Sequence, residues 1–141
     1  MTKPVRFLLA TAVLVALLMV VATQVAFAGS PHFVSVTATR SGNTLTVSGK
    51  EAGLGNETQV HIVVNATAEC INGGGKHPKA VNKESVSAAG DFPVQNGKAN
   101  FSLTLTATFQ PSCSPPMTVA FTNVTVTDTE HNVTARLPGT F

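Results

Sequence analysis

The sequence predicts an all-β fold, namely a single antiparallel β-sandwich of immunoglobulin-like type with six to eight short strands and one disulfide. Hydrophobic and polar residues alternate with a period of two through most of the chain beyond residue 28, as they do in strands that bury one face. Turn-forming residues separate these runs about every 8–12 positions, which is the spacing typical of a sandwich. Threonine and valine, which favour strands, are abundant, and no run has helical periodicity.

The first 28 residues have the pattern of a secretory signal peptide. Lys3 and Arg6 precede an apolar run over residues 7–22, and the small residues that signal peptidase recognises follow at Ala26-Phe27-Ala28. We therefore expect cleavage after Ala28 and secretion of the rest of the chain. The alternative is an uncleaved membrane anchor over residues 7–28, because the apolar run approaches the length that spans a bilayer.

The secreted part, residues 29–141, is long enough for one domain with a substantial core. The full chain has nine lysines and arginines and seven aspartates and glutamates. Loss of Lys3 and Arg6 with the signal peptide makes these two numbers equal, so the formal net charge of the secreted part is zero. This balance argues against binding to nucleic acid or to an anionic membrane surface.

Two strands joined by a turn are expected at the start of the domain. The first covers residues 33–39, the second covers residues 44–50, and the turn is Arg40–Asn43. Alternation directs one set of apolar side chains toward the core, and this set is Val34, Val36, Ala38, Leu45 and Val47.

The middle of the domain contains the longest alternating runs. A strand over residues 59–70 directs Cys70 inward, and residues 85–105 form a hairpin whose Asn96-Gly97 turn accepts positive φ angles. Near the C terminus the parity of the apolar residues changes across Thr122-Asn123, which predicts a β-bulge. A last short strand is expected over residues 133–137.

Cys70 and Cys113 are the two cysteines of the chain. In an exported protein an even pair most simply forms a disulfide, and no C-x-x-C motif suggests redox catalysis. Closing a loop of this length stabilises the domain by roughly 3.5–4 kcal/mol in the chain-entropy model. We therefore predict that this pair is a structural disulfide.

The segment CINGGGKHPK, residues 70–79, has the residue types of a phosphate-binding loop but not the spacing. The first glycine of the P-loop pattern is replaced by Cys70, and His77 replaces the hydroxyl residue that should follow Gly75-Lys76. The glycines are better explained as a chain reversal after the inward-facing cysteine. The outward residues Lys76, His77 and Lys79 then form a possible interaction loop.

Metal binding and cofactor binding are not predicted. The histidines are scattered without the short spacings of zinc sites, at His32, His61, His77 and His131. His61 lies on the polar face of its strand, where a solvated side chain is expected. Asp128 and Glu130 would share one face at the end of a strand, which suits at most a weak calcium site.

Catalysis has no signature in this sequence. There is no G-x-S-x-G motif, and the carboxylates of the secreted part form no evident acid–base pair. Carbohydrate binding by ring stacking is also disfavoured, because the chain has no tryptophan or tyrosine. Since strands bring distant residues together, three or more carboxylates and histidines meeting in one cleft would favour an enzyme.

A family resemblance rests on the motif C-x-N-G-G-G-x-x-P-x-A-x-N-K over residues 70–83, with further agreement at KEAGLG, FPVQNGKA and FTNVTVTD. On these segments the chain resembles a group of small, secreted, β-rich bacterial proteins that are frequent in actinobacteria. The resemblance implies a bacterial exported protein and a paired Cys70 and Cys113. It carries no activity, ligand or catalytic residue.

The function expected from these observations is that of an exported, non-enzymatic binding or surface-associated module. Its partner would be an extracellular protein or a cell-surface component. Two alternatives remain open: a small secreted hydrolase or metal-dependent enzyme without a recognisable motif, and a module tethered to the membrane by residues 7–28.

Overall fold

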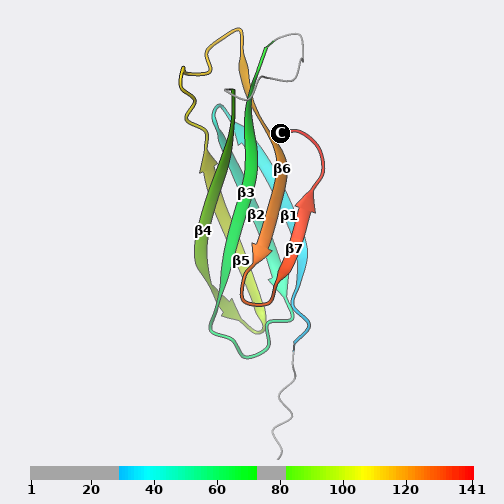
Figure 1. Ribbon diagram of the computed structural model, residues 1–141. Coiled ribbons are helices and arrows are strands. Elements are labelled where there is room, and N and C mark those ends of the chain that lie inside the picture. Colours follow the sequence, from blue (N-terminus) through cyan, green and yellow to red (C-terminus); the bar gives the residue numbers. More distant parts are fainter. Residues whose placement is uncertain (1–28, 73–81) are drawn as a thin grey trace, which may run out of the picture.

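The computed structural model describes residues 29–72 and 82–141, and these residues form seven antiparallel β-strands (Figure 1). The strands are β1 (His32–Ser41), β2 (Thr44–Ala52), β3 (Gln59–Ile71), β4 (Lys83–Gln95), β5 (Lys98–Thr106), β6 (Thr118–Asp128) and β7 (Val133–Leu137). None of the described residues belongs to a helix that could cross a membrane. The signal peptide and the alternative anchor concern residues 1–28, which lie outside the described part of the chain.

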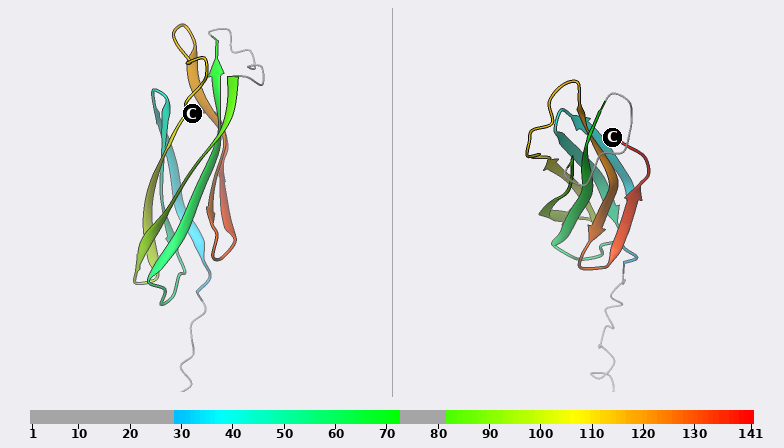
Figure 2. Two further views of the ribbon diagram at one scale, coloured as in Figure 1. Left: turned by 60° about the vertical axis from the view of Figure 1, so that its left-hand side comes forward. Right: turned by 45° about the horizontal axis from the view of Figure 1, so that its top comes forward.

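The strands follow the hydrogen-bonded order β1-β2-β5-β4-β3-β6-β7. Within the described residues, strand pairing joins the two halves of this order only at the β4–β5 hairpin, where Val94 pairs with Ala99 and Gln95 with Lys98. At the opposite side β1 and β7 lie near each other, so the sheet curls almost to closure around its core (Figures 1 and 2). The antiparallel all-β fold is thus confirmed, whereas the two layers of an immunoglobulin-like sandwich stay a prediction.

The core is built from the inward faces of β2, β3, β5 and β6. The inward faces expected for the second and third strands are confirmed, since Leu45, Val60 and Ile62 have no exposed surface. Aromatic contacts centred on Phe101 of β5 fill the core, one with β1 of the same half of the sheet and one with β4 of the other half. The ring centroid of Phe101 lies 5.8 Å from that of Phe33 and 6.0 Å from that of Phe92.

Strand β1 differs from expectation at Val34, whose side chain is 56% exposed. The pairing with β2 moves from Phe33 opposite Glu51 to Ser35 opposite Lys50, so Val34 is an extra residue in a β-bulge. The bulge reverses the alternation, and Phe33 packs against the core in place of Val34. The predicted inward position of Val34 is therefore wrong.

The bulge predicted in β6 is confirmed. Pairing with β3 steps from Asn65 opposite Thr125 to Thr67 opposite Thr122, and Asn123 has a φ of 52°. The Asn96-Gly97 turn of the β4–β5 hairpin also has the expected positive φ angles, of 52° and 71°.

The two ends of the elongated molecule differ in their chemistry (Figure 2). At one end the β2–β3 loop, the β4–β5 turn and the β6–β7 turn come together, and β1 begins there (Figure 1). A hydrogen bond of 3.0 Å from the Leu54 N–H to the Gly97 carbonyl joins two of these loops. At the other end, which we call the disulfide end, Cys70 and Cys113 are linked.

Candidate functional site

Two carboxyl groups are buried where β2 and β6 end. Glu51 and Asp128 both have no exposed surface. Glu51 continues the inward parity of Leu45 and Val47 in β2, and Asp128 continues that of Val126 in β6. The alternation that fills the core with apolar side chains thus also directs these two acidic side chains into its end.

Asp128 fixes the turn that follows β6. Its Oδ1 accepts hydrogen bonds from the backbone N–H groups of Glu130, at 2.9 Å, and His131, at 3.2 Å. Its Oδ2 lies 2.5 Å from Nδ1 of the His131 ring. Asp128 therefore holds the backbone and the imidazole of the β6–β7 turn at the same time.

His131 bridges two carboxylates. While Nδ1 faces Asp128, Nε2 lies 2.7 Å from Oε1 of Glu57 in the β2–β3 loop. The hydrogen bond to Asp128 raises the pKa of the His131 imidazole above its ordinary value. Partial burial acts in the opposite direction, and the hydrogen bond to Glu57 raises this pKa further. Only the protonated ring can donate from both nitrogens.

The Glu51 carboxyl is enclosed without a hydrogen-bond donor, since neither of its oxygens has a partner among the described residues. Burial raises its pKa from 4.5 to about 7, and the negative charge of nearby Asp128 raises it in addition. The His131 charge opposes this shift. A proton held by Glu51 allows the two carboxyl groups to hydrogen-bond, because two carboxylates offer only acceptors to each other.

The outer side of this group is open to solvent. Glu57, Glu130 and His131 each present one potential metal-ligand atom, and these atoms lie within 4.8 Å of one another. Glu57 and Glu130 are exposed and His131 is half-buried. The three residues line a shallow depression together with Asn56, Thr58 and Gln59. We call Glu51, Glu57, Asp128, Glu130 and His131 the acid–histidine cluster.

The expected sharing of one face by Asp128 and Glu130 does not occur. Asp128 is buried and engaged with His131, whereas Glu130 points to solvent. The cluster itself was missed because its members come from β2, the β2–β3 loop, the end of β6 and the β6–β7 turn, and Glu57 and His131 are 74 positions apart. Extending the alternation of β2 and β6 to the ends of these strands would have indicated two buried acids.

His61, which was predicted to be solvated, is partly exposed. Its ring nitrogen Nδ1 lies 2.6 Å from Oδ1 of Asp91.

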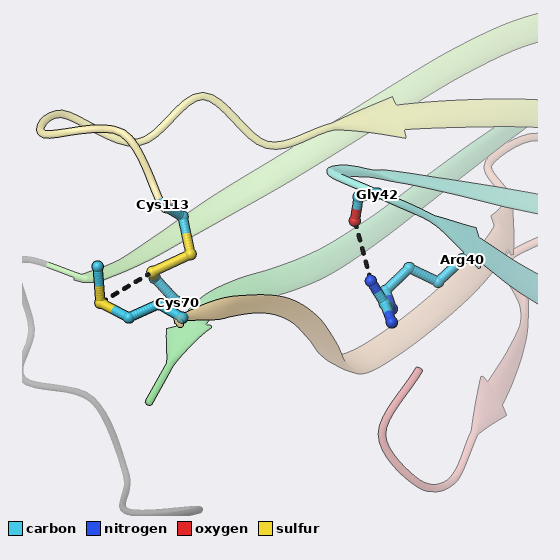
Figure 3. The surroundings of a disulfide bond; sticks show 5 residues. Arg40, Gly42, Cys70 and Cys113 are labelled. Carbon is cyan, nitrogen blue, oxygen red and sulfur yellow. Dashed lines mark hydrogen bonds between the residues drawn. A yellow bond between two sulfur atoms is a disulfide. The ribbon is translucent and has the colours of Figure 1, made fainter. Parts of the chain in front are cut away.

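The predicted disulfide is confirmed at the other end of the molecule (Figure 3). Cys70 and Cys113 are bonded, with their Cα atoms 5.7 Å apart, and the Cys70 sulfur lies 3.8 Å from that of Met117. Nearby, the Arg40 guanidinium donates a hydrogen bond of 3.1 Å to the Gly42 carbonyl in the β1–β2 turn. A disulfide of this kind indicates an oxidising environment such as the cell exterior. The predicted interaction loop of Lys76, His77 and Lys79 lies outside the described residues.

A third feature is the outer face of β1, β2 and β5, which carries serine and threonine in register. Strand pairing aligns nine of these residues in three transverse ranks: Thr37-Ser48-Ser102, Thr39-Thr46-Thr104 and Ser41-Thr44-Thr106. Hydroxyl contacts link neighbouring strands, at 3.1 Å between Thr46 and Thr104 and at 2.9 Å between Ser48 and Ser102. All nine are exposed or half-buried, and we call them the hydroxyl face.

Comparison with known proteins adds little to this description. No protein-family model and no curated protein matches the chain. A solved structure, a β-glucuronidase from Bacteroides uniformis, is similar over 72% of this chain and 12% of its own, with 13% sequence identity and a TM-score of 0.33. A likeness this distant carries no argument about fold or function.

Proposed function

We propose that this chain is an exported, non-enzymatic binding module that contacts an uncharged, hydroxyl-rich polymer, such as a cell-surface polysaccharide, through the hydroxyl face. Export is supported by the N-terminal pattern of charge and apolar residues and by the disulfide. The observation that carries the binding proposal is the alignment of nine hydroxyl side chains on one sheet face.

An immunoglobulin-like sandwich is the finer description of the fold that we favour. It is supported by the narrow junction between the halves of the sheet, where β4 and β5 share only two residue pairs. Strands β1, β2 and β5 would form one layer and β4, β3, β6 and β7 the other. In such a sandwich the hydroxyl face covers the part of this layer's outer surface toward the β1–β2 turn, and Lys50, Asn100 and Lys98 continue the same face toward the other end.

The chemistry of the hydroxyl face matches an uncharged partner. Each serine or threonine hydroxyl donates one hydrogen bond and accepts others, so every position can exchange bonds with a sugar hydroxyl. No lysine, arginine, aspartate or glutamate occupies the three ranks, so binding there desolvates no charge. The backbones of paired residues lie about 4.8 Å apart across strands, and successive ranks lie about 6.7 Å apart along them, so the side chains project from a regular grid.

Affinity at such a face should be low. Hydrogen bonds that replace bonds to water contribute only about 0.5–1.5 kcal/mol each, and the chain has no tryptophan or tyrosine for ring stacking. We therefore expect retention on an insoluble polymer, where many sites raise the effective affinity, rather than tight binding of a short oligosaccharide.

Sedimentation with insoluble neutral and charged polysaccharides tests this proposal. The wild-type chain should sediment with cellulose, a neutral glucan, and less with acidic polygalacturonate. The triple variant Thr39→Val, Thr46→Val and Thr104→Val removes the middle rank while keeping β-branched side chains. It should remain in the supernatant.

A matched control removes three hydroxyls from the other side of the molecule, through Thr125→Val, Thr127→Val and Thr134→Val in β6 and β7. This control should bind as wild type does. Failure of the wild type to bind any neutral polymer, or equal losses in both triple variants, would refute the role of the hydroxyl face. The acid–histidine cluster is a gathering of carboxylates and a histidine of the kind that would favour an enzyme. Release of reducing sugar by the wild-type chain would therefore favour the hydrolase alternative instead.

A further inference from the structure

The surface part of the acid–histidine cluster has the composition of a site for a first-row divalent metal ion. Its donor set is one imidazole nitrogen and two carboxylates, from His131, Glu57 and Glu130, with their ligand atoms within 4.8 Å of one another. Contact of all three atoms with one ion at the usual distances of about 2.0–2.2 Å requires only small side-chain movements, because two ligands on opposite sides of an ion are about 4.4 Å apart. Both carboxylates are exposed, so an ion can reach them from solvent.

The support behind His131 is of the kind found in metal centres. A histidine that binds a metal usually donates its other ring N–H to a carboxylate, which fixes the orientation of the ring and raises the basicity of the ligating nitrogen. Asp128 holds Nδ1 of His131 in this way, at 2.5 Å. Asp128 is itself fixed by two backbone N–H groups and has no exposed surface. Nε2 is therefore the nitrogen that faces Glu57 and the exterior.

An independent observation is the buried Glu51, which is close to Asp128, has no exposed surface and has no partner for either oxygen among the described residues. Burying an acidic group without a donor is costly unless positive charge is nearby. Among the described residues, no lysine or arginine forms an ion pair with Glu51, Glu57, Asp128 or Glu130. Protonated His131 supplies positive charge to the cluster, and this charge is lost when the ring becomes neutral. A divalent cation at the mouth of the cluster would then replace it.

We propose that Glu57, Glu130 and His131 bind one divalent transition-metal ion of the Zn²⁺ class, with Asp128 as the residue that positions His131. A nitrogen ligand favours such ions over Ca²⁺, which prefers sites made of oxygen alone. Three protein ligands leave room for water in the remaining coordination positions. The ion replaces the hydrogen bond between Nε2 and Glu57, so binding requires the neutral ring and weakens as the pH falls. This site is independent of the hydroxyl face.

Isothermal titration of the exported chain, prepared without a polyhistidine tag, with ZnCl₂ and separately with CaCl₂ tests the proposal. We expect saturable binding of one Zn²⁺ per chain and much weaker binding of Ca²⁺. Both cysteines are in the disulfide, so no thiolate competes for the ion. Replacing Zn²⁺ with Co²⁺ should give visible absorption bands that report the ligand set directly.

Three variants locate the site. Glu130→Gln removes an exposed ligand and should weaken Zn²⁺ binding at least about tenfold, while Asp128→Asn should weaken it about 10–100-fold through the orientation of His131. His61→Gln is the matched control, because it breaks another histidine–carboxylate pair, His61–Asp91 at 2.6 Å, without touching the cluster. Circular dichroism verifies that each variant is folded.

The proposal fails if the wild type shows no saturable binding at Zn²⁺ concentrations up to about 1 mM. It also fails if His61→Gln loses as much affinity as Glu130→Gln, or if Ca²⁺ binds more tightly than Zn²⁺. Because Glu130 is exposed, its substitution is not expected to disturb folding. A loss of affinity in Glu130→Gln with an unchanged melting temperature in the absence of metal therefore supports the site itself.

Discussion

Replacing Glu51 with glutamine should change how the stability of this protein depends on pH. Glutamine has the shape of glutamic acid, does not titrate, and carries N–H donors where a protonated Glu51 carries an O–H donor. Burial raises the Glu51 pKa from 4.5 to about 7. Between these two values the folded protein holds a proton that the unfolded chain has released, so the wild type loses stability as the pH rises through this window.

The size of the effect follows from the shift. At about 1.36 kcal/mol per pKa unit, moving the Glu51 pKa from 4.5 to about 7 lowers the wild-type free energy of unfolding by about 3 kcal/mol between pH 4 and pH 8. The raised pKa of His131 acts in the same direction, because its stabilisation is present at low pH and is lost as the pH rises through the folded value. His131 is retained in Glu51→Gln, so the difference between the two proteins reports Glu51 together with its interaction with His131.

Urea denaturation followed by far-ultraviolet circular dichroism, in buffers from pH 4 to pH 8.5 with a chelator present, measures this difference. Fluorescence is unsuitable because the chain has no tryptophan or tyrosine. Glu51→Gln should gain about 3 kcal/mol over the wild type across this range, equivalent to a melting-temperature difference on the order of 10 °C at pH 8. Glu130→Gln, which alters an exposed carboxyl nearby, should run parallel to the wild type. A constant difference between Glu51→Gln and wild type at every pH would refute the assignment.

Three further predictions concern other parts of the fold. Replacing both Cys70 and Cys113 with alanine should lower the free energy of unfolding by roughly 3.5–4 kcal/mol in urea denaturation; an unchanged midpoint would contradict a structural role. Gly49→Ala should destabilise the domain by about 1–3 kcal/mol, because the added methyl carbon would clash with the backbone carbonyl oxygen of Ser35 and lie 2.5 Å from the Phe101 ring; thermal melting at wild-type temperature would show that both the β1 backbone and the ring give way easily. Asn123→Val should cost roughly 1–2 kcal/mol because φ is 52° there, whereas Asn123→Gly should cost little; equal melting temperatures for the two variants would count against the bulge geometry.

Local alternation predicted most strands, because a strand with one buried face has apolar residues at every second position. It also predicted the β6 bulge, where the parity changes at Asn123. It failed at Val34, where the apolar pattern continues through a bulge that only the pairing with β2 reveals. Because valine is tolerated on either face of a strand, the residue type did not indicate that Val34 is exposed.

The acid–histidine cluster depends on which strands are neighbours, and alternation does not specify that. Glu51 and Asp128 carried a local signal in the parity of their strands, but Glu57 and His131 meet only because the β2–β3 loop and the β6–β7 turn lie at the same end of the molecule. The hydroxyl face also depends on which strands are neighbours. Alternating serine and threonine are visible in each strand, whereas their ranks exist only through the β1-β2-β5 order.

The positions of the first and last described residues have a mechanical consequence. β1 begins at the end that holds the cluster, while Phe141 lies toward the disulfide end and exchanges two backbone hydrogen bonds of 3.0 Å with Phe121 (Figure 1). Force applied between Gly29 and Phe141 would load the β1–β2 ladder along the strands, so its hydrogen bonds must break together rather than one at a time. After the ladder has broken, the Cys70–Cys113 disulfide still closes a loop of 43 residues, so this loop cannot extend and the unfolded chain is shorter by about 150 Å. Single-molecule stretching with and without a reductant would measure that length directly.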